Sequence, residues 1–268
     1  MHMKTEDVFS TLINAILEGG NGAFDESLRW WKESELSRLR RCSRRYASIM
    51  RLIPQSQTPI KILDMGTGFG HMAILIRRLF NYEVVCTDVE TTNELRRRFQ
   101  REEIPFYLCD LSKTVLPFPD DCFDVVLFCD ALFLIPQDPR KVLKEFNRIL
   151  KSRGLLILDV PNFLSLYNRI RTLLGKEKTN WCSPYPHYRE YTAEELRNLL
   201  AQTNFFVKKI NLCNTFTPED ISSLSRPMKL LIFHISEALT RFTPSLRDTV
   251  IAIGEKKDES EDKELAPS

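Results

Sequence analysis

Residues 61–80 read KILDMGTGFGHMAILIRRLF, and this stretch decides the fold of the chain. A short apolar run leads into three closely spaced glycines, and apolar residues at helical spacing follow them. A strand, a glycine-rich turn and a helix in this order form the ligand-binding edge of a doubly wound α/β sheet. Glycines at 66, 68 and 70 permit the tight turn and let the backbone approach a ligand closely.

Outward from this stretch, short apolar runs alternate with helical patterns along the chain. The predicted strands are 61–65, 82–88, 105–110, 123–130, 154–160, 205–212 and 249–254, and the predicted helices are 71–80, 91–101, 139–154 and 194–202. Alternation of this kind indicates a parallel sheet covered on both faces. We therefore predict an α/β fold with a doubly wound, seven-stranded, mostly parallel sheet.

The length of 268 residues favours one elaborated domain over two full ones. Apolar residues at steps of three and four between 33 and 53 predict a helix before the sheet. We expect a helical extension at 1–56, a sheet domain at 57–255 and a tail at 256–268 that is too polar to pack.

Two segments, 162–190 and 214–247, do not follow the alternation and are expected to be insertions on the substrate side of the domain. Insertions on a regular scaffold are where specificity tends to reside.

The composition narrows the classes of protein. The chain has 38 basic and 36 acidic residues, a net charge of +2, so nucleic acid is not an expected partner. No apolar run is long enough for a transmembrane segment, and the first residues do not resemble a signal peptide, so we expect a cytoplasmic protein. Seven cysteines without a CxxC pair predict neither disulfides nor a metal site.

Acidic residues end three of the predicted strands. Asp64, Asp88 and Asp110 would lie at one edge of a parallel sheet, and a carboxylate at Asp88, 22 residues beyond Gly66, can accept both hydroxyls of a ribose. A dinucleotide fingerprint needs glycine where His71 stands, which disfavours a pyrophosphate. The three carboxylates favour a cationic ligand that carries adenosine.

These residues resemble the class I S-adenosylmethionine-dependent methyltransferases, specifically the methyltransferase type 11 group, over residues 45–213. The resemblance implies a Rossmann-like methyltransferase fold, an enzyme, and S-adenosylmethionine as cofactor, with S-adenosylhomocysteine as product. It implies cofactor contacts from Asp64, Gly66, Thr67, Gly68, Gly70, Asp88, Val89, Asp110, Leu111 and Asp130. The glycine loop would hold the methionine and ribose, and Asp110 with Leu111 would lie against the adenine.

One departure from the family affects Asp130. The family often has Glu-His nearby, where this chain has Leu132 to Ile135. A cofactor contact and a helix-capping role for Asp130 therefore both stay open.

The insertions suggest where an acceptor would bind. His187 stands among Trp181, Tyr185 and Tyr188, and is a candidate general base or else a surface histidine without chemistry. In 221–242 an apolar stripe recurs at helical spacing. We expect the stripe to pack over the sheet, and it is also a candidate lid for an apolar acceptor or a contact with a membrane surface.

The expected function is methyl transfer to a small-molecule, glycan or lipid-linked acceptor, through an oxygen or nitrogen nucleophile. An RNA methyltransferase that uses the arginines of helix 36–53 is a second hypothesis, although a solvated face explains those arginines better. A methyltransferase-like protein that binds without catalysis is the third.

Overall fold

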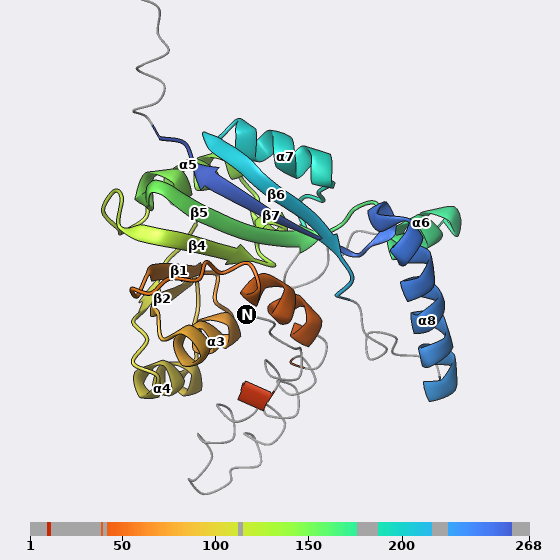
Figure 1. Ribbon diagram of the computed structural model, residues 1–268, viewed down its shortest axis with the longest axis horizontal. Coiled ribbons are helices and arrows are strands. Elements are labelled where there is room, and N and C mark those ends of the chain that lie inside the picture. Colours follow the sequence, from red (N-terminus) through yellow and green to blue (C-terminus); the bar gives the residue numbers. More distant parts are fainter. Residues whose placement is uncertain are drawn as a thin grey trace, which may run out of the picture.

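The computed structural model describes residues 10–11, 39, 42–111, 115–175, 187–215 and 225–258. Seven strands form one sheet in the order β3-β2-β1-β4-β5-β7-β6 (Figure 1). They are β1 (Lys61–Met65), β2 (Glu83–Asp88), β3 (Phe106–Leu108), β4 (Phe123–Cys129), β5 (Leu150–Pro161), β6 (Phe205–Cys213) and β7 (Thr249–Lys256). Only β7 runs antiparallel to its neighbours, so the predicted doubly wound, mostly parallel sheet is confirmed.

Helices cover both faces of this sheet (Figure 1). They are α3 (His71–Phe80), α4 (Asn93–Arg101), α5 (Pro139–Ile149), α6 (Leu166–Leu173), α7 (Ala193–Ala201) and α8 (Arg226–Phe242), with 3-10 turns η1 (Leu132–Leu134) and η3 (Pro244–Leu246). One core cluster joins α3 and α4 to the sheet, and a second joins α5 and α7 to the opposite face. The predicted capping box, Thr192 with Glu195, is present at the start of α7.

Residues 42–50 form the last helical turns before β1 and belong to the first core cluster. Tyr46, Ile49, Met50 and Ile53 are buried, as the apolar spacing of this segment predicts. The segment packs beside α3 in this cluster.

The structure corrects three predicted boundaries. The helix 139–154 ends at Ile149, because Leu150 pairs with Phe123 and begins β5. β3 ends at Leu108, so Asp110 follows the strand instead of ending it. β7 continues to Lys256, whose ammonium group donates to the carbonyl of Leu150 at 2.8 Å.

The expected packing of the 221–242 stripe over the sheet is wrong for the residues that the structure describes. α8 projects beside the carboxyl end of the sheet (Figure 1). Its apolar residues Leu231, Ile235 and Phe242 are exposed, and Thr240 is its one buried residue. Ile221 and Leu224 lie outside the described residues. None of the described helices combines the length and apolarity needed to cross a membrane.

Candidate functional site

The glycine loop is a tight turn between β1 and α3. Gly66, Gly68 and Gly70 all have positive φ, at 70°, 54° and 75°, a region that residues with a Cβ rarely adopt. A Cβ on Gly70 would lie 2.5 Å from the ring of Phe99, so this glycine is needed for packing. A Cβ on Gly68 would meet no atom within 4 Å. The loop therefore faces open space at Gly68.

Asp64 supports this loop from below. It is buried at the end of β1, and its carboxylate accepts a hydrogen bond from the hydroxyl of Thr67 at 2.7 Å. Burial raises the pKa of Asp64 to about 6, against the lowering effect of the Thr67 hydrogen bond. The Thr67 side chain thus points into the protein and braces the loop, while its backbone amide donates to the carbonyl of Thr87.

Asp88 connects the loop to the end of β2. One carboxylate oxygen accepts from the amide of Gly68 at 2.8 Å, and the other accepts from the amide of Val89 at 2.7 Å. Each oxygen keeps a free acceptor position for a hydroxyl group. Two apolar side chains beside it, Val89 and Leu108, are 64% and 57% exposed. A carboxylate with spare acceptors next to exposed apolar surface suits a ribose that carries a flat base.

The segment after β3 lies at the same edge of the sheet. The amide of Cys109 donates to the carbonyl of Asp88 at 2.8 Å, which holds Asp110 close to the end of β2. Asp110 is exposed. Leu111 is half-buried, and its carbonyl accepts from the side chain of Gln137 at 2.7 Å.

Asp130 follows β4 and does not cap a helix, because η1 begins after Ala131 without a side-chain cap. Its carboxylate lies 2.6 Å from the guanidinium of Arg45, which also approaches buried Asp159 of β5 at 3.9 Å. The side chain of Arg45 is only 14% exposed. The solvated-face interpretation is therefore wrong for Arg45, which ties the 42–50 helix to the ends of β4 and β5.

The charges of this cluster are strongly perturbed by burial. Burial raises the pKa of Asp159 to about 6, although the guanidinium of Arg45 acts in the opposite direction. Burial also opposes the charge of Arg45, yet the carboxylates of Asp130 and Asp159 keep the pKa of Arg45 well above its usual value. Arg45 Nε and Asp159 Oδ1 are both buried without a hydrogen-bond partner.

His71 and Tyr46 form a second contact between the 42–50 helix and the loop. A hydrogen bond of 3.0 Å joins the Tyr46 hydroxyl to His71 Nδ1, and both side chains are buried. The ring of His71 also stacks on Phe69. Sequence reasoning treats His71 only as a missing glycine, whereas the structure shows that it connects the loop to the preceding helix.

His187 lies against the turn that follows Asp130. Its ring centroid is 4.3 Å from that of Phe133, and its Nδ1 is 3.9 Å from a carboxylate oxygen of Glu190. The amide of Tyr188 donates to the carbonyl of Phe133 at 3.0 Å. The candidate base therefore lies at the carboxyl end of the strands, whereas Trp181 and Tyr185 lie outside the described residues.

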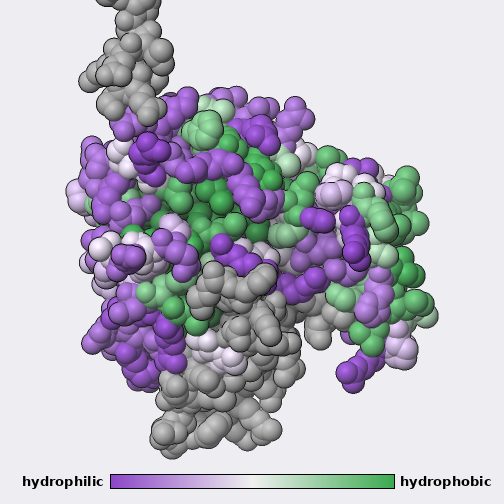
Figure 2. Space-filling model, in the orientation of Figure 1, coloured by the Kyte–Doolittle hydropathy of each residue, from purple (hydrophilic) through white to green (hydrophobic). Residues whose placement is uncertain are grey.

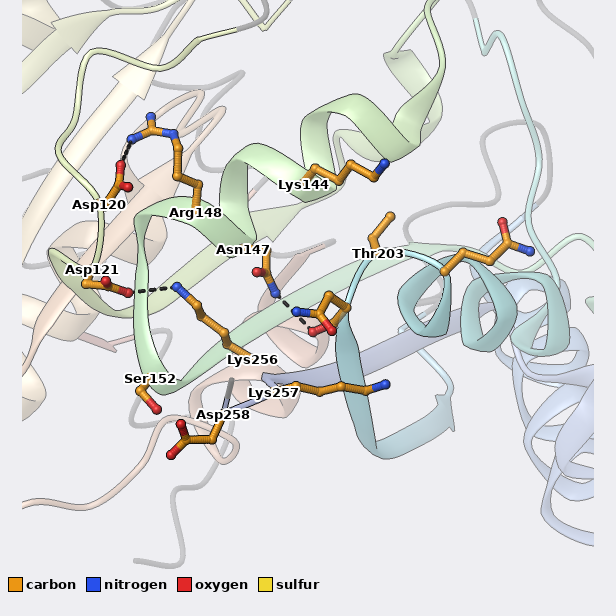
Figure 3. A pocket seen from close by; sticks show the side chains of 12 residues that line it. Asp120, Asp121, Lys144, Asn147, Arg148, Ser152, Thr203, Lys256, Lys257 and Asp258 are labelled. Carbon is orange, nitrogen blue, oxygen red and sulfur yellow. Dashed lines mark hydrogen bonds and ion pairs between the residues drawn. The ribbon is translucent and has the colours of Figure 1, made fainter. Parts of the chain in front are cut away.

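A polar pocket of about 590 Å³ lies at the opposite edge of the sheet (Figure 3). Its lining includes Asp121 before β4, Arg148 at the end of α5, and Lys256 at the end of β7. Lys256 pairs with Asp121, and Arg148 pairs with Asp120 (Figure 3). Because these charges neutralise one another far from the glycine loop, the pocket is not part of the candidate site.

Within the described ranges, no group of three or more histidine, cysteine or acidic side chains could hold a metal ion. Burial raises the pKa of the Cys86 and Cys129 thiols well above the usual value. Both therefore stay protonated near neutral pH, which disfavours a role as metal ligands.

Part of this chain is similar to known methyltransferases. Residues 63–158 match the family model of a methyltransferase domain of type 11. The glycine/sarcosine/dimethylglycine N-methyltransferase of Actinopolyspora halophila is 33% identical over 105 residues, which are 38% of this chain and 18% of that protein. A probable S-adenosylmethionine-dependent methyltransferase of Mycobacterium tuberculosis is 27% identical over 175 residues, 65% of this chain and 58% of that protein. The chain thus spans less than two thirds of either relative.

A solved structure shows the same fold. The S-adenosylmethionine-dependent methyltransferase of Thermotoga maritima, described as a possible histamine N-methyltransferase, has a TM-score of 0.57 at 18% identity. The match covers 95% of this chain and 100% of that chain. At this identity the likeness concerns the fold alone.

Proposed function

We propose that this chain transfers a methyl group from S-adenosylmethionine to a small-molecule, glycan or lipid-linked acceptor, because residues 63–158 match the family model of a methyltransferase domain. One observation supports this most strongly. The hydrogen bond from the Gly68 amide to Asp88 brings the glycine loop and the predicted ribose carboxylate together at one edge of the sheet. The A. halophila relative is named for methylation of small amines, which supports an acceptor of low mass.

The residues at this edge fit the cofactor. Asp88 would accept the ribose hydroxyls, and the loop at Gly68 would lie along the methionine part. Asp110 with Leu111 would lie against the adenine, beside the exposed side chains of Val89 and Leu108. The carboxylates of Asp64 and Asp88 place negative charge where a cation would bind. S-adenosylmethionine, when bound, supplies a methyl group on a positively charged sulfur.

The acceptor would approach from the side of His187 and the segment after β5. An oxygen or nitrogen nucleophile must lie in line with the methyl group, and alignment alone supplies a large part of the rate enhancement. A neutral imidazole at His187 could accept the proton that the nucleophile loses. The ring of Phe133 packs against this imidazole, and a carboxylate oxygen of Glu190 lies 3.9 Å from Nδ1.

Of the three arginines that the structure describes between residues 42 and 53, Arg51 is exposed, but Arg44 and Arg45 give the RNA hypothesis little support. Arg44 forms an ion pair with Glu237 at 3.0 Å, and Arg45 is held by Asp130. Guanidinium groups used inside the protein are not available to contact phosphates. Arg38, Arg40 and Arg41 lie outside the described residues.

Release of S-adenosylhomocysteine in the presence of a panel of amines, hydroxylated metabolites, glycans and lipid-linked sugars tests this function. We expect turnover with at least one acceptor class.

Asp88→Ala should weaken S-adenosylmethionine binding at least tenfold, because two hydrogen bonds from the ribose to a carboxylate are lost. Calorimetry measures that affinity. Cofactor binding without turnover on any acceptor would favour the non-catalytic hypothesis, and an unchanged affinity of Asp88→Ala would refute the ribose role.

Asp64→Asn is expected to change stability and cofactor affinity in opposite directions. The pKa of Asp64, about 6, lies above its unfolded value, so its stabilising contribution is complete below about pH 4 and is lost as the pH rises through 6. At pH 8 the free energy of unfolding of the variant should be about 1 to 3 kcal/mol higher than that of the parent. Its affinity for the cationic cofactor should fall, because a nearby negative charge is lost.

Urea denaturation at pH 4 and pH 8, together with calorimetry, measures both effects. Asp124→Asn is the matched control. Asp124 lies at the amino end of β4, away from the glycine loop, where its carboxylate accepts a hydrogen bond from the amide of Lys61 at 2.8 Å. This control should leave the cofactor affinity unchanged. If Asp64→Asn destabilises the protein at pH 8, the ionised carboxylate of Asp64 does not lower the stability of the fold, contrary to what its burial predicts.

A further inference from the structure

α8 has its polar face toward the protein and its apolar face outward. Glu237 pairs with Arg44 and also accepts from the side chain of Asn214 at 3.0 Å, while Thr240 is buried. Positions 228, 231, 235, 239 and 242 fall within a sector of roughly 80° on the opposite side, at about 100° per residue. All five side chains are exposed, with Ile235 at 52% and Phe242 at 85%. A helix of a water-exposed domain normally has the reverse arrangement.

The segment of α6 extends this exposed apolar surface. Its exposed apolar residues are Phe163, Leu164, Tyr167, Ile170, Leu173 and Leu174. The side chain of Asn162 donates to the carbonyls of Ser245 and Arg247, at 3.0 and 2.7 Å, so the start of this segment is joined to the chain that follows α8. Figure 2 shows hydrophobic atoms gathered at the right of the molecule, where Figure 1 has α6 and α8. We call residues 163–175 and 225–247 together the α6–α8 surface.

The α6–α8 surface is also strongly basic. Its charged residues are Arg169, Arg171, Arg226, Lys229, Arg241, Arg247 and Glu237. The half-buried guanidinium of Arg247 donates to the carbonyls of Thr240 and Leu212, so the other basic residues are the ones available to headgroups. The net charge of this surface is therefore +5, whereas the whole chain has +2. Its one acidic residue is turned inward onto Arg44. Exposed apolar side chains flanked by arginine and lysine are the pattern of a helix that lies in the interface of an anionic lipid layer.

We propose that the α6–α8 surface docks the protein on an anionic lipid surface. Charge complementarity favours this occupant over a second copy of the chain, because two surfaces of charge +5 repel each other. Apolar residues of α8 would enter the layer, and the basic residues at its ends, Arg226, Lys229 and Arg241, would contact the headgroups. An apolar area of this extent is unusual on a protein that stays in water.

The position of this surface bears on the acceptor, a step that rests on the proposed function. α6 follows the carboxyl end of β5, and β7 begins directly after η3, so the α6–α8 surface lies at the same edge of the sheet as the glycine loop. Docking would turn that edge toward the lipid. Among the three proposed acceptor classes, this geometry favours the lipid-linked one.

Co-sedimentation of the full chain with vesicles tests the docking. We expect at least about tenfold stronger binding to phosphatidylcholine vesicles that contain phosphatidylglycerol than to phosphatidylcholine alone, with a decrease as salt rises. The double variant Leu231→Gln/Ile235→Gln should lower binding to the anionic vesicles at least tenfold. Arg226→Glu/Lys229→Glu should lower it similarly without reducing the weak binding to neutral vesicles.

Phe206→Gln and Lys209→Glu are matched controls, because both residues are exposed on the edge strand β6. They should bind vesicles like the parent, and all variants should melt like the parent. A parent protein that does not sediment with anionic vesicles overturns the proposal. The same holds if the double variant binds them unchanged. Another outcome is a parent protein that self-associates without binding vesicles. If Leu231→Gln/Ile235→Gln abolishes that self-association, the surface binds a second copy of the chain.

Calorimetry with S-adenosylmethionine on the same preparations separates the two proposals. A parent protein that binds the cofactor but does not bind anionic vesicles overturns the docking and leaves the methyltransferase function in place. Vesicle binding by a parent protein that does not bind the cofactor overturns the proposed function and leaves the docking in place.

Discussion

Gly68→Val is expected to abolish binding of S-adenosylmethionine, with a loss of affinity of at least about a hundredfold, or roughly 2.7 kcal/mol. A Cβ at this position meets no protein atom within 4 Å, so the branched side chain would occupy the space that the cofactor needs. The substitution also strains the backbone, because φ is 54° and β-branched residues avoid that region. Calorimetry gives the affinity, and thermal melting shows whether the variant is folded.

Gly175→Val is the matched control for that backbone strain. Gly175 follows α6 with φ of 63°, and a Cβ there also meets nothing within 4 Å. The control should lose stability to a similar extent and keep its affinity for the cofactor. Equal affinities of Gly68→Val and the parent protein would mean that the cofactor does not lie over this loop.

Arg45→Met is expected to destabilise the protein by about 3 to 5 kcal/mol at pH 8, because it leaves the carboxylate of Asp159 buried without its cationic partner. Since the pKa of Asp159 already lies above its unfolded value, and loss of Arg45 raises it further, the destabilisation should shrink as the pH falls to 5. Urea denaturation at several pH values measures this effect.

Adding Asp159→Asn to Arg45→Met should restore most of the lost stability, because the second substitution removes the unpaired charge. Arg77→Met is the control for a simple loss of an arginine. Arg77 pairs with Glu103 at 3.2 Å in an exposed position, where an ion pair contributes less than about 1 kcal/mol. If Arg45→Met and Arg77→Met lower the free energy of unfolding by the same small amount, the buried cluster does not stabilise the fold.

The predictions that agree with the structure rest on local patterns. Lys61 to Phe80 form a strand, a turn with three positive φ values, and a helix, as the apolar runs and glycine spacing predict. Thr192 and Glu195 form a capping box for the same reason, since both partners are three residues apart. A pattern of this kind is sufficient because the interaction and the signal occupy the same few residues.

Charge pairing was not predictable in this way. Arginines 44 and 45 look like a solvated helix face in the sequence, yet Arg44 pairs with Glu237, which is 193 residues away, and Arg45 with Asp130. The sequence shows the charge of each side chain, but the partner is chosen by which strand ends and helices meet in the folded chain. The link between His71 and Tyr46 has the same origin.

By itself, the sequence determined the sheet, the glycine loop and the carboxylates at its edge, because strand ends of a parallel sheet fall at one edge whatever else the chain does. Only the tertiary structure decided the orientation of α8. Helical periodicity identifies the apolar stripe that includes Leu231 and Ile235, but a stripe carries no information about whether another element covers it. The contact of Glu237 with Arg44 turns the polar face of α8 inward, and the apolar face is therefore left exposed.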